Sequence, residues 1–243
     1  YASKLQDIIA NVSATLDSSE GPYSQEREVK NLLIVPVTSN RGLCGGFNSG
    51  VIKAVNALME ENKGANISLF TIGKKSQQAY KRTDLVSAED IEIWNDLTFA
   101  NASDIADQLM AEFLEGKWDR IVLVYNRFKN AASQDVIAEQ FLPIAGSEEN
   151  TSDSSNAGEY LYEPGKGEIL DILIPKSLKT QVFKVLLDSN ASEHGARMTA
   201  MHKATDNAKE LKDGLTLDYN KARQAAITNE ILEIVGGAEA LAS

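Results

Sequence analysis

A glycine-rich segment, residues 41–48 with the sequence RGLCGGFN, is the stretch whose composition is closest to that of a ligand site. It follows an apolar run and precedes a helical pattern, the position at which many nucleotide-binding proteins hold a phosphate. Its spacing is neither G-x-G-x-x-G nor G-x-x-x-x-G-K-[ST], and Phe47 and Asn48 stand where a nucleotide site requires a lysine and a hydroxyl. We therefore expect Gly45 and Gly46 to form a tight structural turn, with a phosphate loop as the alternative.

The remaining groups that could do chemistry are isolated from one another. Cys44 has neither histidine near it in the sequence, and a single cysteine cannot form an intrachain disulfide, which fits a reducing cytoplasm. His194 and His202 are eight positions apart, too far for one metal ion, and no acidic or cysteine partner is placed beside them. The sequence therefore predicts no catalytic residue, no cofactor and no metal site.

Arg223 and Gln224 form a different kind of candidate site. They stand beside Ala222, Ala225 and Ala226, so a long planar donor and an amide project from among small side chains. Such groups suit binding to carboxylates on a surrounding protein. The alternative is the ordinary polarity of an exposed helix surface.

These two residues belong to a long helical pattern at residues 176–235. It contains no proline and is rich in the strong helix formers Ala, Lys, Glu, Gln, Leu, Arg and Met. We expect the helix to begin after Pro175 and to end at the pair Gly236 and Gly237. A continuous helix of this length would extend about 90 Å, more than a compact domain of this size can cover.

Small and apolar residues recur along this helix in steps of three or four, the seam of a coiled coil. Gly195 and Gly214 each weaken the helix by about 1 kcal/mol relative to alanine. The pattern favours a shaft whose partner lies elsewhere, although an ordinary bundle helix is the alternative. The seam residues are Met198, Met201, Ala204, Ala208, Leu211, Leu215, Tyr219, Ala222 and Ala226.

The preceding part of the chain alternates apolar strands with amphipathic helices, which predicts an α/β fold, a Rossmann-like domain with a mostly parallel sheet at residues 28–165. The last strand is expected to pair back on the fourth as a hairpin, and Ser103 to cap the third helix. Residues 1–20 are expected to be the remnant of an N-terminal helix, 147–159 a mobile surface loop and 166–175 a short connecting helix, before the long helix at 176–236. The expected strands are 31–38, 67–73, 91–94, 121–128 and 136–144, and the expected helices 51–62, 74–82 and 103–115.

Charge is distributed unevenly along the chain. The net charge is −11, from 24 Lys and Arg against 35 Asp and Glu. Residues 176–235 hold nine of the basic and eight of the acidic residues, a charge of +1, so the remainder carries −12. An acidic domain disfavours nucleic acid and anionic lipid as partners. The longest apolar run, residues 32–37, is too short to span a bilayer, so we expect no direct membrane insertion.

Three segments together closely resemble the gamma subunits of F-type rotary ATP synthases: SNRGLCGGFN, SEHGARMTAMHKATDNAKEL and LDYNKARQAAITNEILEIVGGAEAL. NRFKN, FLPI and YLYEP are also similar to that family, and the match covers nearly the whole chain. The resemblance implies a central-stalk rotor that binds no nucleotide, catalyses nothing and transmits torque during proton-driven ATP synthesis. It implies a shaft of two antiparallel helices inside a ring of alpha and beta subunits, with the Rossmann-like domain near epsilon and the c-ring.

The resemblance also assigns partner-binding residues. Arg223, Gln224 and Thr228 match the positions that contact the beta subunit, and Tyr160 and Glu163 match the region that faces epsilon and the c-ring. The paired cysteines of the chloroplast redox switch are absent, which favours a bacterial over a chloroplast source, with a mitochondrial source as the alternative. For a bacterial source, the resemblance implies a peripheral location on the cytoplasmic face of the inner membrane.

The family's N-terminal helix is mostly absent, so we interpret the chain as a fragment whose seam another protein surface must cover. For a fragment studied alone, that surface would be a second copy. Two other interpretations stay open. One is a Rossmann-type nucleotide-binding enzyme that dimerises through the long helix, which nucleotide binding would identify. The other is an unrelated coiled-coil scaffold, which would not associate with an alpha–beta ring.

Overall fold

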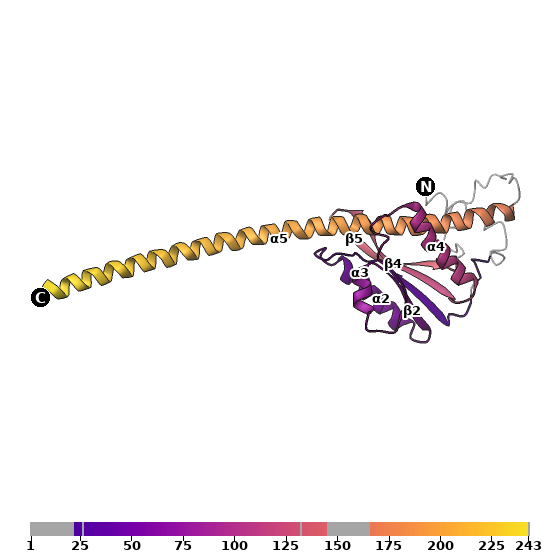
Figure 1. Ribbon diagram of the computed structural model, residues 1–243, viewed down its shortest axis with the longest axis horizontal. Coiled ribbons are helices and arrows are strands. Elements are labelled where there is room, and N and C mark those ends of the chain that lie inside the picture. Colours follow the sequence, from indigo (N-terminus) through magenta and orange to yellow (C-terminus); the bar gives the residue numbers. More distant parts are fainter. Residues whose placement is uncertain (1–21, 26, 132, 145–165, 243) are drawn as a thin grey trace, which may run out of the picture. The chain divides into compact units, whose positions relative to one another are not determined.

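The computed structural model describes residues 22–25, 27–131, 133–144 and 166–242 of the chain (Figure 1). The chain divides into two compact units, Tyr1–Met198 and Thr199–Ser243. The expected N-terminal remnant, the loop at 147–159, and the candidate residues Tyr160 and Glu163 lie outside the described residues.

A five-stranded sheet with the order β3-β2-β1-β4-β5 forms the centre of the first unit. The first four strands are parallel and β5 pairs antiparallel with β4, so the predicted mostly parallel sheet and its hairpin are confirmed. Five of the six residues of β1 are buried, as expected for a central strand covered on both faces. The strands are β1 (Asn31–Pro36), β2 (Asn66–Ile72), β3 (Val86–Asp90), β4 (Arg120–Asn130) and β5 (Ser133–Leu142).

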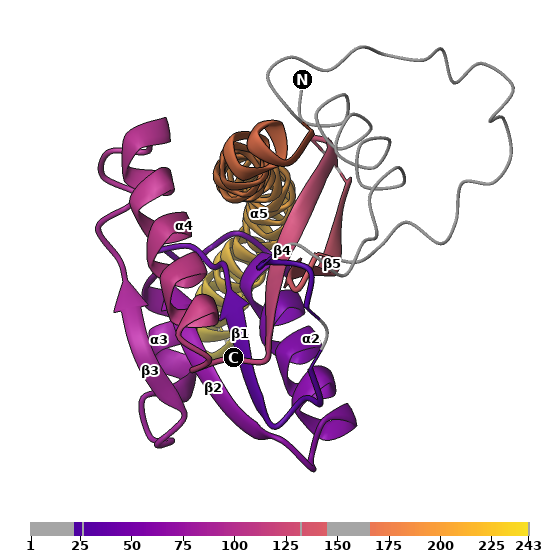
Figure 2. The same cartoon turned by 90° about the vertical axis from the view of Figure 1, so that its right-hand side faces the viewer.

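Helices cover both faces of the sheet (Figure 2). Helices α2 (Phe47–Glu61) and α3 (Lys74–Tyr80) contribute to one apolar cluster with β1, β2 and β4. Helix α4 (Phe99–Leu114) and the first part of α5 (Lys166–Ala242) pack in a second cluster on the opposite face. The result is the three-layer arrangement of a doubly wound α/β domain.

Two local predictions are wrong. The third strand was expected at residues 91–94, but β3 is Val86–Asp90, and its exposed polar side chains are tolerated because it is an edge strand. The cap of α4 is Thr98, whose Oγ1 accepts from the Asn101 N–H at 3.3 Å. Ser103 lies inside the helix and donates its hydroxyl to the Phe99 carbonyl at 2.7 Å.

Helix α5 is one continuous helix of 77 residues, so the predicted break at Pro175 and the separate connecting helix are wrong. Ile174 and Leu178 are buried on either side of Pro175, and this tertiary packing holds the helix where proline removes one donor. The predicted end at Gly236 is also wrong: Gly236 and Gly237 lower helix propensity but lie in open space, and α5 continues to Ala242.

Within the first unit, α5 is fixed by both apolar and polar contacts. Lys179 forms an ion pair with Asp107 of α4 at 2.7 Å, and the rings of Phe99 and Phe183 pack edge to face with centroids 5.6 Å apart. These contacts align α5 with α4 over the sheet. The buried residues of α5 are Ile174, Leu178, Val182, Val185, Leu186, Ser189, Ser192, Gly195 and Ala196.

The second unit consists of the continuation of α5. Residues 201–240 are exposed throughout, apart from the half-buried Asn220. The long C-terminal helix predicted from composition is therefore confirmed. Among the described residues, no helix is both long enough and apolar enough to span a bilayer.

Candidate functional site

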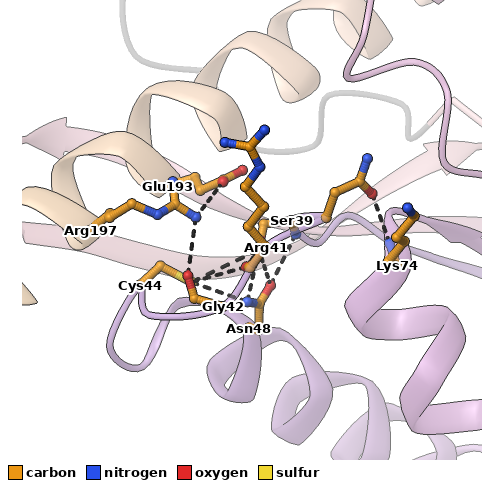
Figure 3. A network of polar contacts seen from close by, with 9 residues as sticks. Ser39, Arg41, Gly42, Cys44, Asn48, Lys74, Glu193 and Arg197 are labelled. Carbon is orange, nitrogen blue, oxygen red and sulfur yellow. Dashed lines mark hydrogen bonds and ion pairs between the residues drawn. The ribbon is translucent and has the colours of Figure 1, made fainter.

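The glycine-rich loop folds into a turn that its own side chains close (Figure 3). Gly45 has a φ of 58°, in the left-handed region that favours glycine. Asn48 accepts from the Ser39 N–H at 3.0 Å and donates its amide to Ser39 Oγ at 2.9 Å and to Cys44 Sγ at 3.1 Å. Asn48 therefore stabilises its own loop, as expected for a structural turn.

A second set of polar contacts ties the loop to α3. Asn40 accepts from the backbone N–H of Lys74 at 2.9 Å and donates its amide to the Ile91 carbonyl at 2.9 Å. The loop thus joins the C-terminal ends of three strands, β1, β2 and β3.

Helix α5 lies where a doubly wound sheet ordinarily binds its ligand. In this strand order the ligand crevice is at the carboxyl ends of β1 and β4, where the order reverses. Ser192 of α5 donates its hydroxyl to the Asn126 carbonyl of β4 at 3.1 Å, and the Asn126 amide donates to the Phe47 carbonyl at 3.2 Å. Ala196 forms a buried cluster with Cys44 and Phe47. Protein side chains therefore occupy this crevice.

An arginine extends the contact to the tip of the loop. Arg197 Nη2 lies 2.7 Å from a carboxylate oxygen of Glu193, one helical turn earlier, and donates to the Gly42 carbonyl at 3.4 Å. The Glu193 side chain is only 13% exposed, so the ion pair is partly shielded from water.

Gly195 has a packing role that its helix propensity alone does not reveal. A Cβ at this position would lie 2.8 Å from the carbonyl oxygen and 3.1 Å from the Cα of Ala131, in the turn of the β4–β5 hairpin. Side chains larger than hydrogen would collide with that turn. A glycine among strong helix formers was the available signal, because such a position often marks a close approach of two backbones.

A carboxylate also links the hairpin to α5. Glu139 of β5 accepts from the Tyr125 hydroxyl at 2.7 Å and from the Gln181 amide of α5 at 2.7 Å. Burial and this hydrogen bond raise the pKa of Tyr125, so its hydroxyl stays protonated and donates. Burial also raises the pKa of Asp188, a residue of α5 whose carboxyl is close enough to Glu139 to be affected by its charge.

The predicted partner-binding residues Arg223, Gln224 and Thr228 all lie on the exposed continuation of α5. Thr228 Oγ1 donates to the Gln224 carbonyl at 2.9 Å. One helical turn separates these two residues, so they share a face, with Arg223 adjacent.

The other polar candidates behave as solvated or buried side chains. His194 and His202 are exposed, and Cys44 is buried with 2% of its surface accessible. In the part of the chain that the structure describes, no three His, Cys, Asp or Glu residues are grouped to hold a metal ion.

The fold and this contact region define a class of protein: a Rossmann-like domain whose ligand crevice is filled by residues 192–196 of its own long helix. The ATP synthase family model matches residues 1–241. The chain is 57% identical to the ATP synthase gamma chain of Christiangramia forsetii and 56% identical to that of Flavobacterium johnsoniae, in each case over 99% of this chain and 84% of the relative.

Solved structures agree with the sequence relatives. The central stalk and c-ring structure of the Tetrahymena thermophila mitochondrial ATP synthase matches with 25% identity and a TM-score of 0.58, over 84% of this chain and 95% of that one. A Euglena gracilis mitochondrial ATP synthase chain, 21% identical with a TM-score of 0.64, covers 99% of this chain and 90% of its own length and supports the fold. The chain belongs to the ATP synthase gamma-chain family, the rotor subunits of the central stalk.

Proposed function

We propose that this chain transmits torque between a membrane c-ring and a catalytic alpha–beta ring, and that no bond is made or broken on it. The observation that carries the proposal is the placement of α5. Ser192 and Ala196 fix α5 in the crevice of the domain, while residues 201–240 present an exposed helix. A rotating shaft requires one segment that is fixed to its domain and another whose surface is free to contact other subunits.

The mechanism proposed is a shift of conformational populations. A helix that touches each beta subunit differently binds the open and closed states of those subunits with different affinities. Rotation then changes which subunit is open and which is closed. The differential contacts, rather than a chemical group on this chain, would drive the catalytic cycle.

The contacts proposed with the beta subunit are made by Arg223, Gln224 and Thr228, whose exposed positions leave their polar groups available to a surrounding ring. Tyr160 and Glu163 are proposed to face epsilon and the c-ring. These assignments follow from the family resemblance.

The proposed location is the cytoplasmic face of the bacterial inner membrane, as a peripheral part of the synthase.

Nucleic acid is disfavoured as a partner by the charge of −12 outside residues 176–235. The nucleotide-binding alternative is disfavoured because α5 lies in the crevice that a dinucleotide would need.

The exposed apolar side chains of α5 require cover from another protein. Leu211, Leu215 and Tyr219 are each about 60% exposed, at 64%, 59% and 66%, and lie within the seam defined from the sequence. In the synthase the alpha–beta ring would cover them. In isolation the chain is expected to self-associate through this seam, which sedimentation at tens of micromolar would detect.

Reconstitution tests the proposal. The alpha and beta subunits are mixed with or without the chain, and ATP hydrolysis and the mass of the complex are measured. The chain should join the ring as one copy and raise steady hydrolysis. A ring that excludes the chain, or turns over identically without it, would contradict the proposal.

A further inference from the structure

The last buried part of α5 lies just before Met198, the boundary of the first unit. Ser189, Ser192 and Ala196 are at most 7% exposed, whereas residues 201–240 include none that is buried. Among buried contacts, those of residues 189–196 are therefore the first to resist a twisting force applied to the exposed part of the helix.

Apolar burial alone resists rotation poorly, because the hydrophobic effect has no preferred direction. Two contacts in this segment are directional. The first is steric: the missing side chain of Gly195 receives the Ala131 backbone, whose carbonyl oxygen lies 2.8 Å from where a Cβ would be. Rotating α5 about its axis would move the side chain of a neighbouring residue against the hairpin turn.

The second directional contact is a buried chain of hydrogen bonds. The Ser192 hydroxyl donates to the Asn126 carbonyl, and the Asn126 amide donates to the Phe47 carbonyl at the start of α2. Ser192 and Asn126 are each 1% exposed, so breaking this chain by rotation would leave buried polar groups unpaired. The chain links α5, β4 and α2, which lie in all three layers of the domain.

We propose that Gly195, Ser192 and Asn126 are positioning residues that fix the rotational angle of α5 on the domain. We refer to these three residues with Ala131 as the α5 lock. The lock prevents the helix from slipping when torque passes between the domain and the exposed helix. This inference rests on the proposed rotor function and adds the residues through which the torque is transmitted.

The test uses the intact synthase in membrane vesicles. Two activities are measured on each variant: ATP synthesis driven by an imposed potential and pH gradient, and ATP hydrolysis. Gly195→Ala places a methyl group against the hairpin and should lower the ratio of synthesis to hydrolysis several-fold, because slipping loses torque while the ring still hydrolyses ATP.

Gly50→Ala is the matched control. Its Cβ would lie 2.9 Å from Val136 Cγ2, so it strains the packing of α2 on β5 at a similar distance but away from α5. The lock predicts a normal ratio in this variant. An equal fall in both variants, or an unchanged ratio in Gly195→Ala, would overturn the inference.

A second variant keeps the test decisive if Gly195→Ala fails to assemble. Ser192→Ala removes the hydroxyl without adding volume, and the lock predicts that the ratio falls again; an unchanged ratio overturns it. In the isolated chain Gly195→Ala should lower the melting temperature, whereas Gly214→Ala, in open space, should not. Failure of wild-type protein to support any gradient-driven synthesis would instead contradict the proposed function.

Discussion

Gly45 and Gly46 illustrate how one residue type can indicate a ligand site that the rest of the loop does not support. Their loop has the place of a phosphate loop, yet Asn48 hydrogen-bonds within the loop and α5 packs against Cys44 and Phe47. The polar groups of the loop therefore bind one another rather than a ligand. Its function is to hold α5 at the carboxyl edge of the sheet.

Titration with ATP or ADP tests this interpretation. We expect calorimetry to show no saturable binding in the micromolar range, because protein side chains fill the crevice. A saturable signal that Gly46→Val abolishes would show instead that the loop holds a phosphate. Gly46 suits this control because its φ of −81° is accessible to other residues and the nearest atom to an added Cβ, outside its chain neighbours, is 4.0 Å away.

Asp188, a half-buried carboxyl of α5, offers a test of the electrostatics where this helix packs on the domain. Burial, with a smaller contribution from Glu139, raises the pKa of this carboxyl above its unfolded value, although Lys184 and Arg127 oppose the shift. The folded state therefore favours the protonated form, and this stabilisation is present below the unfolded pKa and lost as pH rises through the folded pKa.

Asp188→Asn should accordingly raise the free energy of unfolding at pH 7 and flatten its fall between acid and neutral pH. Denaturant unfolding at several pH values measures this effect. Asp206→Asn, which removes an exposed carboxylate from the same helix, is the control and should not raise the free energy of unfolding at pH 7. A loss of stability at pH 7 in Asp188→Asn would contradict the interpretation.

Helix α5 shows how tertiary packing overrides local sequence signals. Proline inside a helix removes one hydrogen bond and costs roughly 3 kcal/mol. Pro175 is nevertheless the tenth residue of α5, because Ile174 and Leu178 are buried against the sheet domain on either side of it.

Replacing this proline should therefore stabilise the protein. Pro175→Ala restores a donor and is expected to increase the free energy of unfolding by up to about 3 kcal/mol. Denaturant unfolding of the isolated chain measures the change. Ala204→Pro, in the exposed part of α5, should instead lower the helix content measured by circular dichroism. Destabilisation by Pro175→Ala would mean that the proline has a structural role beyond being tolerated.

The sequence predicted the elements whose signals are local and repeated. Apolar runs identified β1 and β4, and composition identified the long helix. The predicted position of the edge strand β3 was wrong because its sequence, VSAED, has little apolar character. The neighbouring Ile91 and Ile93 suggested a strand where the chain in fact turns. The contact of Gly195 with Ala131 joins residues far apart in the chain, and no local pattern reports such a contact.

A rotor subunit works only if its exposed helix acts on other subunits. Arg223→Ala and Gln224→Ala should each lower ATP turnover or assembly of the synthase, because each loses hydrogen bonds to a partner of about 1–3 kcal/mol. The stability of the isolated chain should barely change, since both side chains are exposed. Lys221→Ala, exposed on the same helix, is a comparison for simple loss of charge. Wild-type turnover and assembly in both variants would remove these residues from the partner interface.

Rotation of the chain within the alpha–beta ring can be observed directly. Cys44 is 2% exposed, so within this chain a cysteine introduced at the exposed Lys81 can be labelled selectively with a bead or gold particle before assembly. The alpha–beta ring is fixed to a surface through its own subunits, and ATP is supplied. We expect the label to turn in one direction in discrete steps, with a rate that follows ATP concentration. A label that stays fixed while the same complexes hydrolyse ATP would show that the chain is not a rotor.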